Sequence, residues 1–316
     1  MQTHASLPLS RKEAIVTRTI HKDFRRNRLL YLMILPVLIY YSVFQYGPMY
    51  GALIAFKDYS PSAGIWGSDW IGFTNFSDFF NGYYFSRIIK NTVLISVYTL
   101  VFEFPAPILL ALLVNELRNR TFRRIVQSVT YMPYFISLVV ICGMIKDFTN
   151  TNGVINQLFG LLGYEGGAML QNSDLFRPIY VFSEIWQHIG WESIIYIAAL
   201  ANIDQEQFEA ADMDGAGRLS KIWYITLPGL VPTIMIMLIL RIGNMMNVGF
   251  EKIILLYNPA TYETADVIST YVYRKGILEM SWSFGAAVGL FNSVINLLLL
   301  VLANYISRRV NQNSLW

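Results

Sequence analysis

The chain of 316 residues is 54% hydrophobic and only 14% charged, and its mean hydropathy is +0.42. Soluble proteins carry about 25% charged residues, so this composition excludes an ordinary soluble enzyme. The single cysteine, Cys142, excludes a disulfide framework and a thiolate metal cluster, three separate histidines argue against a histidine metal site, and a net charge of +3 is too small to indicate nucleic acid as a partner.

Six apolar stretches are long enough to be membrane spans, since a helix needs about 20 apolar residues to cross a bilayer core. They cover residues 29–46, 92–114, 125–145, 178–200, 222–245 and 284–306. Apolar residues continue after the first stretch toward Phe56, whereas Glu184, His188 and Glu192 interrupt the fourth. The sequence therefore predicts an all-α membrane protein with six transmembrane helices.

Lysine and arginine are unequally distributed between the segments that join these stretches. Fifteen lie in the N-terminal tail, after the second and fourth stretches and in the C-terminal tail, against eight in the longer alternate segments. Because positive residues are retained on the cytoplasmic side, we expect both termini in the cytoplasm. The basic tail does not have the pattern of a removed signal peptide.

These boundaries predict four parts of the chain. They are a cytoplasmic basic tail (1–28), the first transmembrane helix with an outer loop (29–86), a transmembrane core (87–306) with a cytoplasmic loop at 204–228, and a cytoplasmic C-terminal tail (307–316). The outer loop is rich in aromatic residues such as Trp66, Trp70 and Tyr83. An interfacial aromatic belt explains them, and a docking surface for an extracytoplasmic protein is the alternative.

The cytoplasmic loop at 204–228 has the signals of two short helices joined by a tight turn. Asp204 can cap the first helix, with Gln207 completing a capping box. Gly215 can adopt the left-handed conformation that ends that helix, and Pro228 is tolerated near the start of the next span. Physical chemistry alone predicts a rigid acidic helix-turn-helix, which is either a solvated surface or a contact for another protein.

This loop resembles the EAA loop of the permeases of binding-protein-dependent ABC importers. The residues that match are Glu209, Ala210, Ala211, Asp214, Gly215, Ala216, Ile225, Leu227 and Pro228. Segments 56–61, 190–200, 249–259 and 264–273 resemble the oligosaccharide and polysaccharide permeases of the LplB type. The resemblance implies a type I ABC importer transmembrane fold with a MetI-like core, in which residues 209–216 belong to a coupling helix for the ATPase.

The resemblance also implies a bacterial inner-membrane location, surrounded by lipid, and a set of partners. They are a second homologous permease, two cytoplasmic ATPase subunits, an extracytoplasmic solute-binding protein and a saccharide substrate, with acidic alginate oligosaccharides as an example. The chain has no Gly-x4-Gly-Lys-Ser/Thr phosphate loop. We therefore expect a non-catalytic permease without a cofactor of its own, whose partner ATPase uses ATP and magnesium.

Polar residues inside the apolar stretches are candidates for the substrate path, because ionisable groups in a membrane are costly. The candidates are Glu184, Gln187, His188, Trp191, Glu192, Arg241, Asn244 and Asn292. An interhelical polar network is the alternative for the five residues on the fourth stretch. Helix geometry places Arg241 and Glu184 at similar depth, so Arg241 either forms an ion pair with Glu184 or binds a substrate carboxylate.

Two further features have structural interpretations. Gly285, Gly289, Asn292 and Asn296 fall on one helix face, which favours close packing over substrate contact. Glu103 lies near Pro105, so we expect it to compensate a loosened backbone. An intramembrane enzyme is an alternative function, but the sequence lacks the metal or carboxylate motif that such an enzyme would need. A proton-coupled transporter could use Glu184, His188 and Glu192, but the EAA-like loop would have no role in it.

Overall fold

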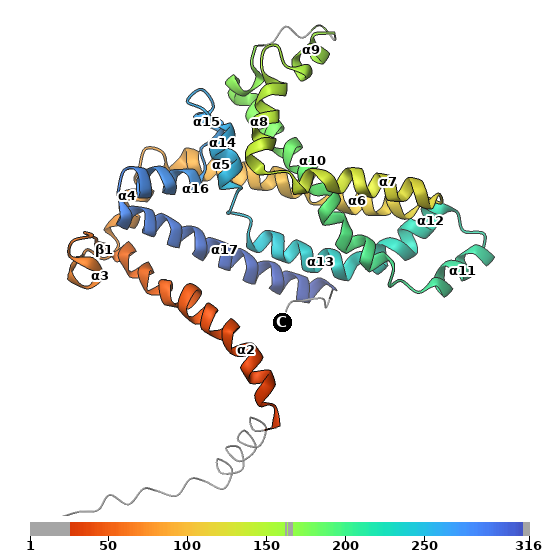
Figure 1. Ribbon diagram of the computed structural model, residues 1–316, viewed down its shortest axis with the longest axis horizontal. Helices are drawn as coiled ribbons and strands as arrows, with labels where there is room; N and C mark the ends of the chain where they lie inside the picture. The colour runs from red at the N-terminus through yellow and green to blue at the C-terminus, as the bar shows by residue number, and fades with distance from the viewer. Residues whose placement is uncertain (1–25, 162, 164–166, 312–316) are drawn as a thin grey trace, which may run out of the picture. The chain divides into compact units, whose positions relative to one another are not determined.

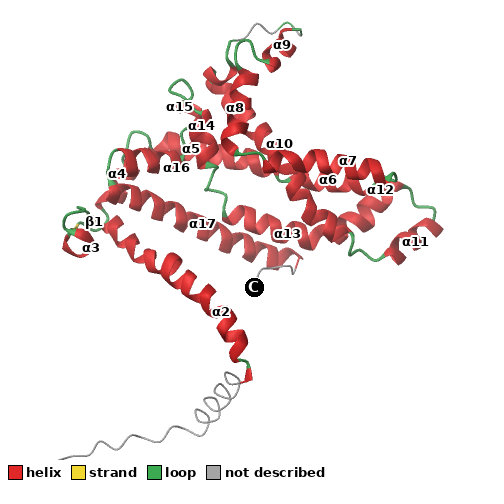
Figure 2. Cartoon of the chain, in the orientation of Figure 1, coloured by secondary structure: helices red, strands yellow, loops and turns green. Residues whose placement is uncertain are grey.

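The computed structural model describes residues 26–161, 163 and 167–311. Residues 1–25 and 312–316, on which most of the two predicted cytoplasmic tails falls, lie outside the described residues. The described chain is almost entirely helical (Figure 2), which confirms the predicted class. It divides into two compact units, residues 1–53 and 54–316.

The described part of the first unit is one long apolar helical segment. It consists of α2 (Arg28–Tyr40), the π-helix η1 (Tyr41–Tyr46) and the 3-10 helix η2 (Gly47–Phe56), whose last residues belong to the second unit. None of the side chains of α2 or η1 is buried. The run Arg28–Phe56 is long and apolar enough to cross a membrane, as predicted for the stretch 29–46.

The second unit begins with a small subdomain. Its elements are β1 (Lys57–Asp58), α3 (Gly64–Gly67), β2 (Asp69–Trp70) and α4 (Thr74–Phe80). The two strands pair antiparallel, with Lys57 opposite Trp70. Phe56 stacks on Trp70 with ring centroids 5.6 Å apart, so aromatic packing holds part of the predicted aromatic loop together.

The remaining elements form the helical bundle and its connecting segments (Figure 1). In chain order they are α5 (Phe85–Tyr98), η3 (Thr99–Glu103), α6 (Pro105–Asn115), α7 (Arg120–Tyr131), η4 (Met132–Phe135), α8 (Leu138–Thr149), α9 (Val154–Gly160), η5 (Met169–Gln171), α10 (Ser173–Leu200), α11 (Gln205–Met213), α12 (Arg218–Lys221), η6 (Ile222–Thr226), α13 (Leu227–Gly243), α14 (Phe250–Leu256), α15 (Tyr262–Ala265), α16 (Ile268–Val272), η7 (Tyr273–Leu278) and α17 (Trp282–Asn311). Among them η3, η6 and η7 are π-helical turns.

Four helical runs among the described residues are long and apolar enough to cross a membrane. They are Arg28–Phe56, Phe85–Asn115, Arg218–Gly243 and Trp282–Arg309. A fifth candidate is a pair of helices, Arg120–Phe135 and Leu138–Gly160, which are bent by 100° relative to each other. The prediction of one continuous helix over 125–145 is therefore wrong. Ile136 and Ser137 have extended backbone between the two helices.

The fourth predicted stretch, 178–200, forms the larger part of α10. This helix starts earlier than predicted because the side chain of Asn172 accepts a hydrogen bond from the N–H of Asp174 at 2.9 Å. It is 28 residues long, but Glu184 and Glu192 make it less apolar than the four runs above. Six spans therefore remain a prediction, of which the composition of the helices supports four or five.

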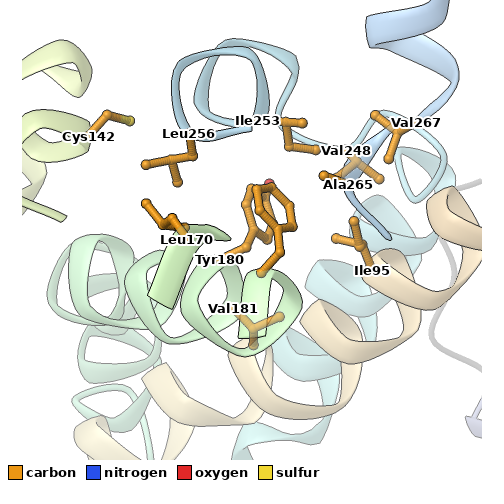
Figure 3. Packing of buried hydrophobic residues seen from close by; sticks show 11 residues of the cluster. Ile95, Cys142, Leu170, Tyr180, Val181, Val248, Ile253, Leu256, Ala265 and Val267 are labelled. Atoms are coloured by element: carbon orange, nitrogen blue, oxygen red, sulfur yellow. The ribbon is translucent and has the colours of Figure 1, made fainter. Parts of the chain in front are cut away.

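The core of the second unit lies where α5, α8, α10 and α14 meet (Figure 3). Its buried residues include Ile95 of α5, Cys142 of α8, Tyr180 of α10 and Leu256 of α14. Elsewhere α6 packs on α10, and α13 packs on α17. Burial of these apolar side chains fixes how the polar residues of α10 face their neighbours.

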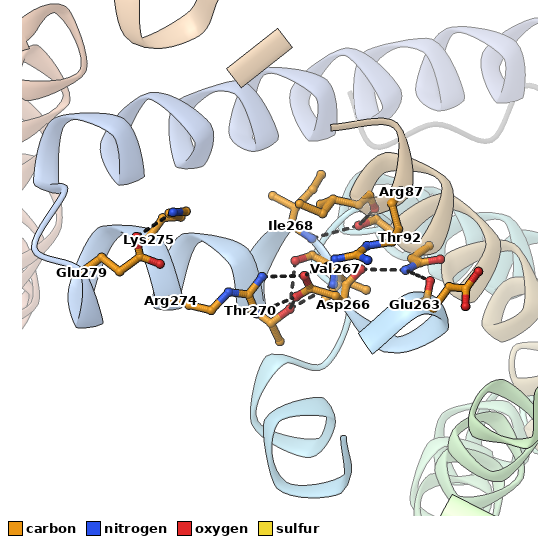
Figure 4. Close-up of polar contacts among 12 residues, drawn as sticks. Arg87, Thr92, Glu263, Asp266, Val267, Ile268, Thr270, Arg274, Lys275 and Glu279 are labelled. Atoms are coloured by element: carbon orange, nitrogen blue, oxygen red, sulfur yellow. Dashed lines mark hydrogen bonds and ion pairs between the residues drawn. The ribbon is translucent and has the colours of Figure 1, made fainter. Parts of the chain in front are cut away.

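A buried carboxylate, Asp266, ties the segment after α14 to the bundle (Figure 4). It accepts hydrogen bonds from Arg274 at 2.6 Å and from Thr270 at 2.8 Å, and it lies 3.9 Å from Arg87 of α5. The side chain of Asn91, also on α5, donates to the Asp266 carbonyl at 3.0 Å. The segment between the last two predicted spans is therefore a packed structure and not a free loop.

Candidate functional site

A small polar cavity of about 190 Å³ lies inside the bundle. It is lined by η3 and the end of α5, by α10, and by α13 with the turn that follows it; the residues are Ser96, Thr99, Leu100, Glu103, Tyr180, Glu184, Arg241, Asn244, Met245, Asn247, Val248 and Gly249. Glu184, Arg241 and Asn244 are thus brought together as candidates for one path. Gln187, His188, Trp191, Glu192 and Asn292 are not among the lining residues.

Arg241 is paired with Glu103 and not with Glu184. One guanidinium nitrogen of Arg241 donates to the Glu103 carboxylate at 2.5 Å. The Glu103 side chain is only 3% exposed, whereas that of Arg241 is 35% exposed. The predicted Arg241–Glu184 pair is therefore wrong, and so is the interpretation of Glu103 as a partner for loosened backbone.

Glu184 lies instead between two other basic side chains. Its carboxylate is 2.8 Å from the Lys252 Nζ of α14 and 3.3 Å from the His188 Nδ1. Lys252 is 2% exposed and also donates to the side-chain oxygen of Gln187 at 3.3 Å. The distribution of lysine and arginine predicts Lys252 in an outer loop. In the structure Lys252 is buried, and its contacts with Glu184 and Gln187 join α14 to α10.

Ligand atoms suited to a cation lie at and beside the cavity. The carboxylates of Glu103 and Glu184 and the ring of His188 offer ligand atoms within 4.8 Å of one another. Both carboxylates are already neutralised, Glu103 by Arg241 and Glu184 by Lys252. Because a buried charge is stable only when it is paired, we interpret this cluster as an ion-pair network.

Trp191 belongs to an aromatic cluster at the junction of α10 and η4. Its ring stacks on Tyr134 with centroids 4.6 Å apart and an interplanar angle of 5°. The neighbouring Gly190 lies so close to α7 that an added Cβ would be 2.0 Å from the carbonyl oxygen of Thr130. Trp191 is still 41% exposed, so one side of this cluster is not covered by the chain.

The asparagine and glycine residues of α17 have different neighbours. Asn292 donates to Asn247, and Asn247 donates to Asn244, each at 2.6 Å. An added Cβ at Gly285 would lie 2.7 Å from the Cα of Gly276, whereas Gly289 has no atom within 4 Å. The prediction of close packing is therefore confirmed for Gly285 and wrong for Gly289.

The cytoplasmic loop of the sequence analysis forms α11 and a turn into α12. Asp204 accepts a hydrogen bond from the N–H of Glu206 at 3.0 Å, which confirms it as the N-cap. At the other end Gly215 has φ +73°, and its N–H donates to the Asp212 carbonyl at 3.1 Å. The N–H of Ala216 donates to the Ala211 carbonyl at 2.8 Å. These bonds form a Schellman motif, which requires a left-handed residue at Gly215.

Most residues in the second half of α11 and in the turn after it are exposed, so another protein can contact them. Glu209, Ala210, Asp214 and Gly215 are exposed, while Ala211 and Ala216 are half-buried. Lys221 of α12 forms an ion pair with Asp212 of α11. The loop is therefore a defined turn with an exposed face, closed by the Schellman hydrogen bonds and by an ion pair.

Sequence reasoning missed three residues of the cavity network: Glu103 as the partner of Arg241, Lys252, and Tyr180. The Tyr180 hydroxyl accepts a hydrogen bond from the N–H of Gly249 at 3.2 Å. Charge provided one usable signal, because Glu103 and Arg241 are opposite charges within two predicted spans. The sequence contains no signal that Lys252 is buried, because its position shortly after the fifth predicted span is also typical of a lysine in an outer loop.

The fold and the paired charges inside an apolar bundle define a helical membrane protein with a polar cavity between its helices. Residues 103–312 match the model of the binding-protein-dependent transport system inner membrane component. The chain is 45% identical over 293 residues to Protein LplB of Bacillus subtilis, covering 92% of each chain.

Two solved structures have the same fold. The crystal structure of a bacterial ABC transporter involved in the import of the acidic polysaccharide alginate has a TM-score of 0.86 and 44% identity, over 93% of this chain and 99% of that one. The alginate transporter in complex with an alginate pentasaccharide-bound periplasmic protein has the same TM-score, coverage and 43% identity. The chain therefore belongs to the family of inner-membrane permease subunits of binding-protein-dependent ABC transporters, which are not themselves catalytic.

Proposed function

We propose that this permease imports an oligosaccharide that an extracytoplasmic binding protein delivers. A second homologous permease completes the path, and two cytoplasmic ATPase subunits supply the energy from ATP and magnesium. The observation that carries this proposal is the exposed left-handed turn at Gly215 in a chain of this family. Reconstitution with the partner subunits tests it: uptake should require ATP and the binding protein, and a proton gradient should not replace ATP.

An acidic oligosaccharide is the substrate class that we favour. The solved transporter with 44% identity is described as importing the acidic polysaccharide alginate. In this chain Arg241 faces the cavity and is 35% exposed although Glu103 is paired with it. A guanidinium can hold two carboxylates because it has five donors. The same path would include Glu184 and Asn244, which line the cavity, together with Gln187, His188, Trp191, Glu192 and Asn292.

The exposed α11 turn is the proposed contact for the ATPase, through Glu209, Ala210, Ala211, Asp214, Gly215 and Ala216. Glu209→Lys reverses the charge on its outward face. Gly215→Val places a β-branched residue at φ +73°, at a cost of about 1–3 kcal/mol. Each change should abolish substrate-stimulated ATP hydrolysis while the permease still inserts in the membrane.

Gly217→Val is the matched control for the coupling variants. Gly217 has φ −70° and no atom within 4 Å of an added Cβ. A valine is therefore compatible with its backbone, and ATP hydrolysis should stay within about twofold of wild type. Normal stimulation in both Glu209→Lys and Gly215→Val would contradict the coupling role.

The proposed orientation places α11 and both termini in the cytoplasm. It is tested by single cysteines in a Cys142→Ser background, with a membrane-impermeant thiol reagent. Cysteines at the exposed positions Ser62 and Ala260 should react in intact cells, whereas one at the exposed Gln207 should react only after lysis. Reaction of the Gln207 position in intact cells would mean that the spans have been miscounted.

A further inference from the structure

A second polar pocket, of about 700 Å³, lies between the end of α6, the start of α7 and the α11–α12 turn. Its lining includes Arg118, Arg120, Arg123, Arg218 and Lys221. The acidic residues that line it are Glu116 and Asp212. The pocket is therefore strongly cationic, and none of the intramembrane residues discussed above belongs to it.

Two of the five basic side chains are already engaged. Arg123 donates to the carbonyls of Val114 and Asn115 at the end of α6, and Lys221 is paired with Asp212. Arg118, Arg120 and Arg218 are exposed and form no ion pair with any residue in the described part of the chain. Their guanidinium groups are free to bind an anion from outside the chain.

The position of this pocket along the helices points to the membrane surface. The candidate spans Phe85–Asn115 and Arg218–Gly243 and the bent pair that begins at Arg120 all have one end at the pocket. Directly after α12, Trp223 and Tyr224 are 67% and 80% exposed. Exposed tryptophan and tyrosine at the end of a span are typical of the headgroup region.

We propose that the pocket binds the headgroup of an anionic phospholipid of the cytoplasmic leaflet. Basic pockets between transmembrane helices on the cytoplasmic side are suited to anionic lipid headgroups. Arginine also binds phosphate oxygens in a bidentate manner. The inference rests on the orientation proposed above. Because the pocket joins α6 and α7 to the α11–α12 turn, the bound lipid would brace the coupling loop against the bundle.

The test compares two double variants of the full importer complex in the same lipids. Arg118→Gln/Arg120→Gln removes two pocket charges, and Arg308→Gln/Arg309→Gln removes two charges from the end of α17. Each complex is reconstituted in vesicles of phosphatidylcholine alone or with an equal amount of phosphatidylglycerol. Bound phosphatidylglycerol is measured by native mass spectrometry and by displacement of a fluorescent analogue, with inorganic phosphate as a competitor.

The pocket variant should bind phosphatidylglycerol at least about tenfold more weakly, and the α17 variant should bind it as wild type does. Equal binding by all three complexes would overturn the proposal, and so would displacement by inorganic phosphate alone. Loss of the ATPase from the pocket variant in both lipid mixtures would assign the pocket to the ATPase instead. Lipid binding is read directly, so failure of this inference is distinguishable from failure of ATP-driven uptake in wild type.

Discussion

Arg241→Ala should prevent both stable assembly of the importer and transport, because it leaves the carboxylate of Glu103 buried without a partner. That carboxylate is 3% exposed, and breaking a buried ion pair costs about 3–5 kcal/mol. Adding Glu103→Gln removes the unpaired charge, so the double variant should assemble again. If Arg241 also binds the substrate carboxylate, this double variant should still transport at least about tenfold more slowly than wild type.

Assembly is measured by co-purification of the partner subunits, and transport by uptake of labelled oligosaccharide into vesicles. The control is Lys275→Ala, which breaks the exposed ion pair between Lys275 and Glu279. Exposed ion pairs contribute about 0–1 kcal/mol, so this variant should behave as wild type. Transport at the full wild-type rate by the Arg241→Ala/Glu103→Gln double variant would exclude a substrate role for Arg241.

Gly190→Val should prevent the permease from folding. A Cβ at Gly190 would lie 2.0 Å from the carbonyl oxygen of Thr130, and this atom cannot move without shifting the backbone of α7. Overpacking costs typically 1–3 kcal/mol and more where backbone must move. The measurement is the yield of monodisperse permease after detergent extraction, together with its thermal midpoint.

Gly289→Val is the matched control in α17, since no atom lies within 4 Å of its added Cβ. Its yield and thermal midpoint should equal those of wild type. Gly190→Ala should be intermediate, because it adds the clashing Cβ but no branch. A wild-type yield for Gly190→Val would show that α7 and α10 are not in contact as described.

The local features of this protein could be predicted from its sequence more fully than the distant contacts. The Asp204 cap and the left-handed Gly215 depend on a few neighbouring residues, and the structure has both. Four of the six apolar stretches are recovered as continuous spans, because composition alone identifies them. The sequence does not reveal the bend after Phe135, because apolar residues continue across it from α7 into the more apolar α8.

The prediction of which charged residues pair is wrong for a different reason. The depth calculation for Arg241 and Glu184 assumed straight helices that begin at Pro228 and Pro178. The helical run that contains Arg241 begins at Arg218, and α10 begins at Ser173. Depth also says nothing about the angle around the bundle, so it could not distinguish Glu103 from Glu184 as a partner. Which acid Arg241 meets depends on how η3, α10 and α13 pack around the cavity that Tyr180 also lines.

The π-helical turn η3 has a consequence for how side-chain direction is counted along the second span. The N–H of Phe104 donates to the Thr99 carbonyl, five residues earlier, at 3.1 Å. A π turn holds one residue more than an α turn, and each residue of an α-helix turns the chain by about 100°. Residues on the two sides of Thr99–Glu103 are therefore out of phase by about 100°. Glu103, which pairs with Arg241, is the last residue of this turn. A regular 3.6-residue period counted from α5 therefore predicts the wrong helix face for its side chain.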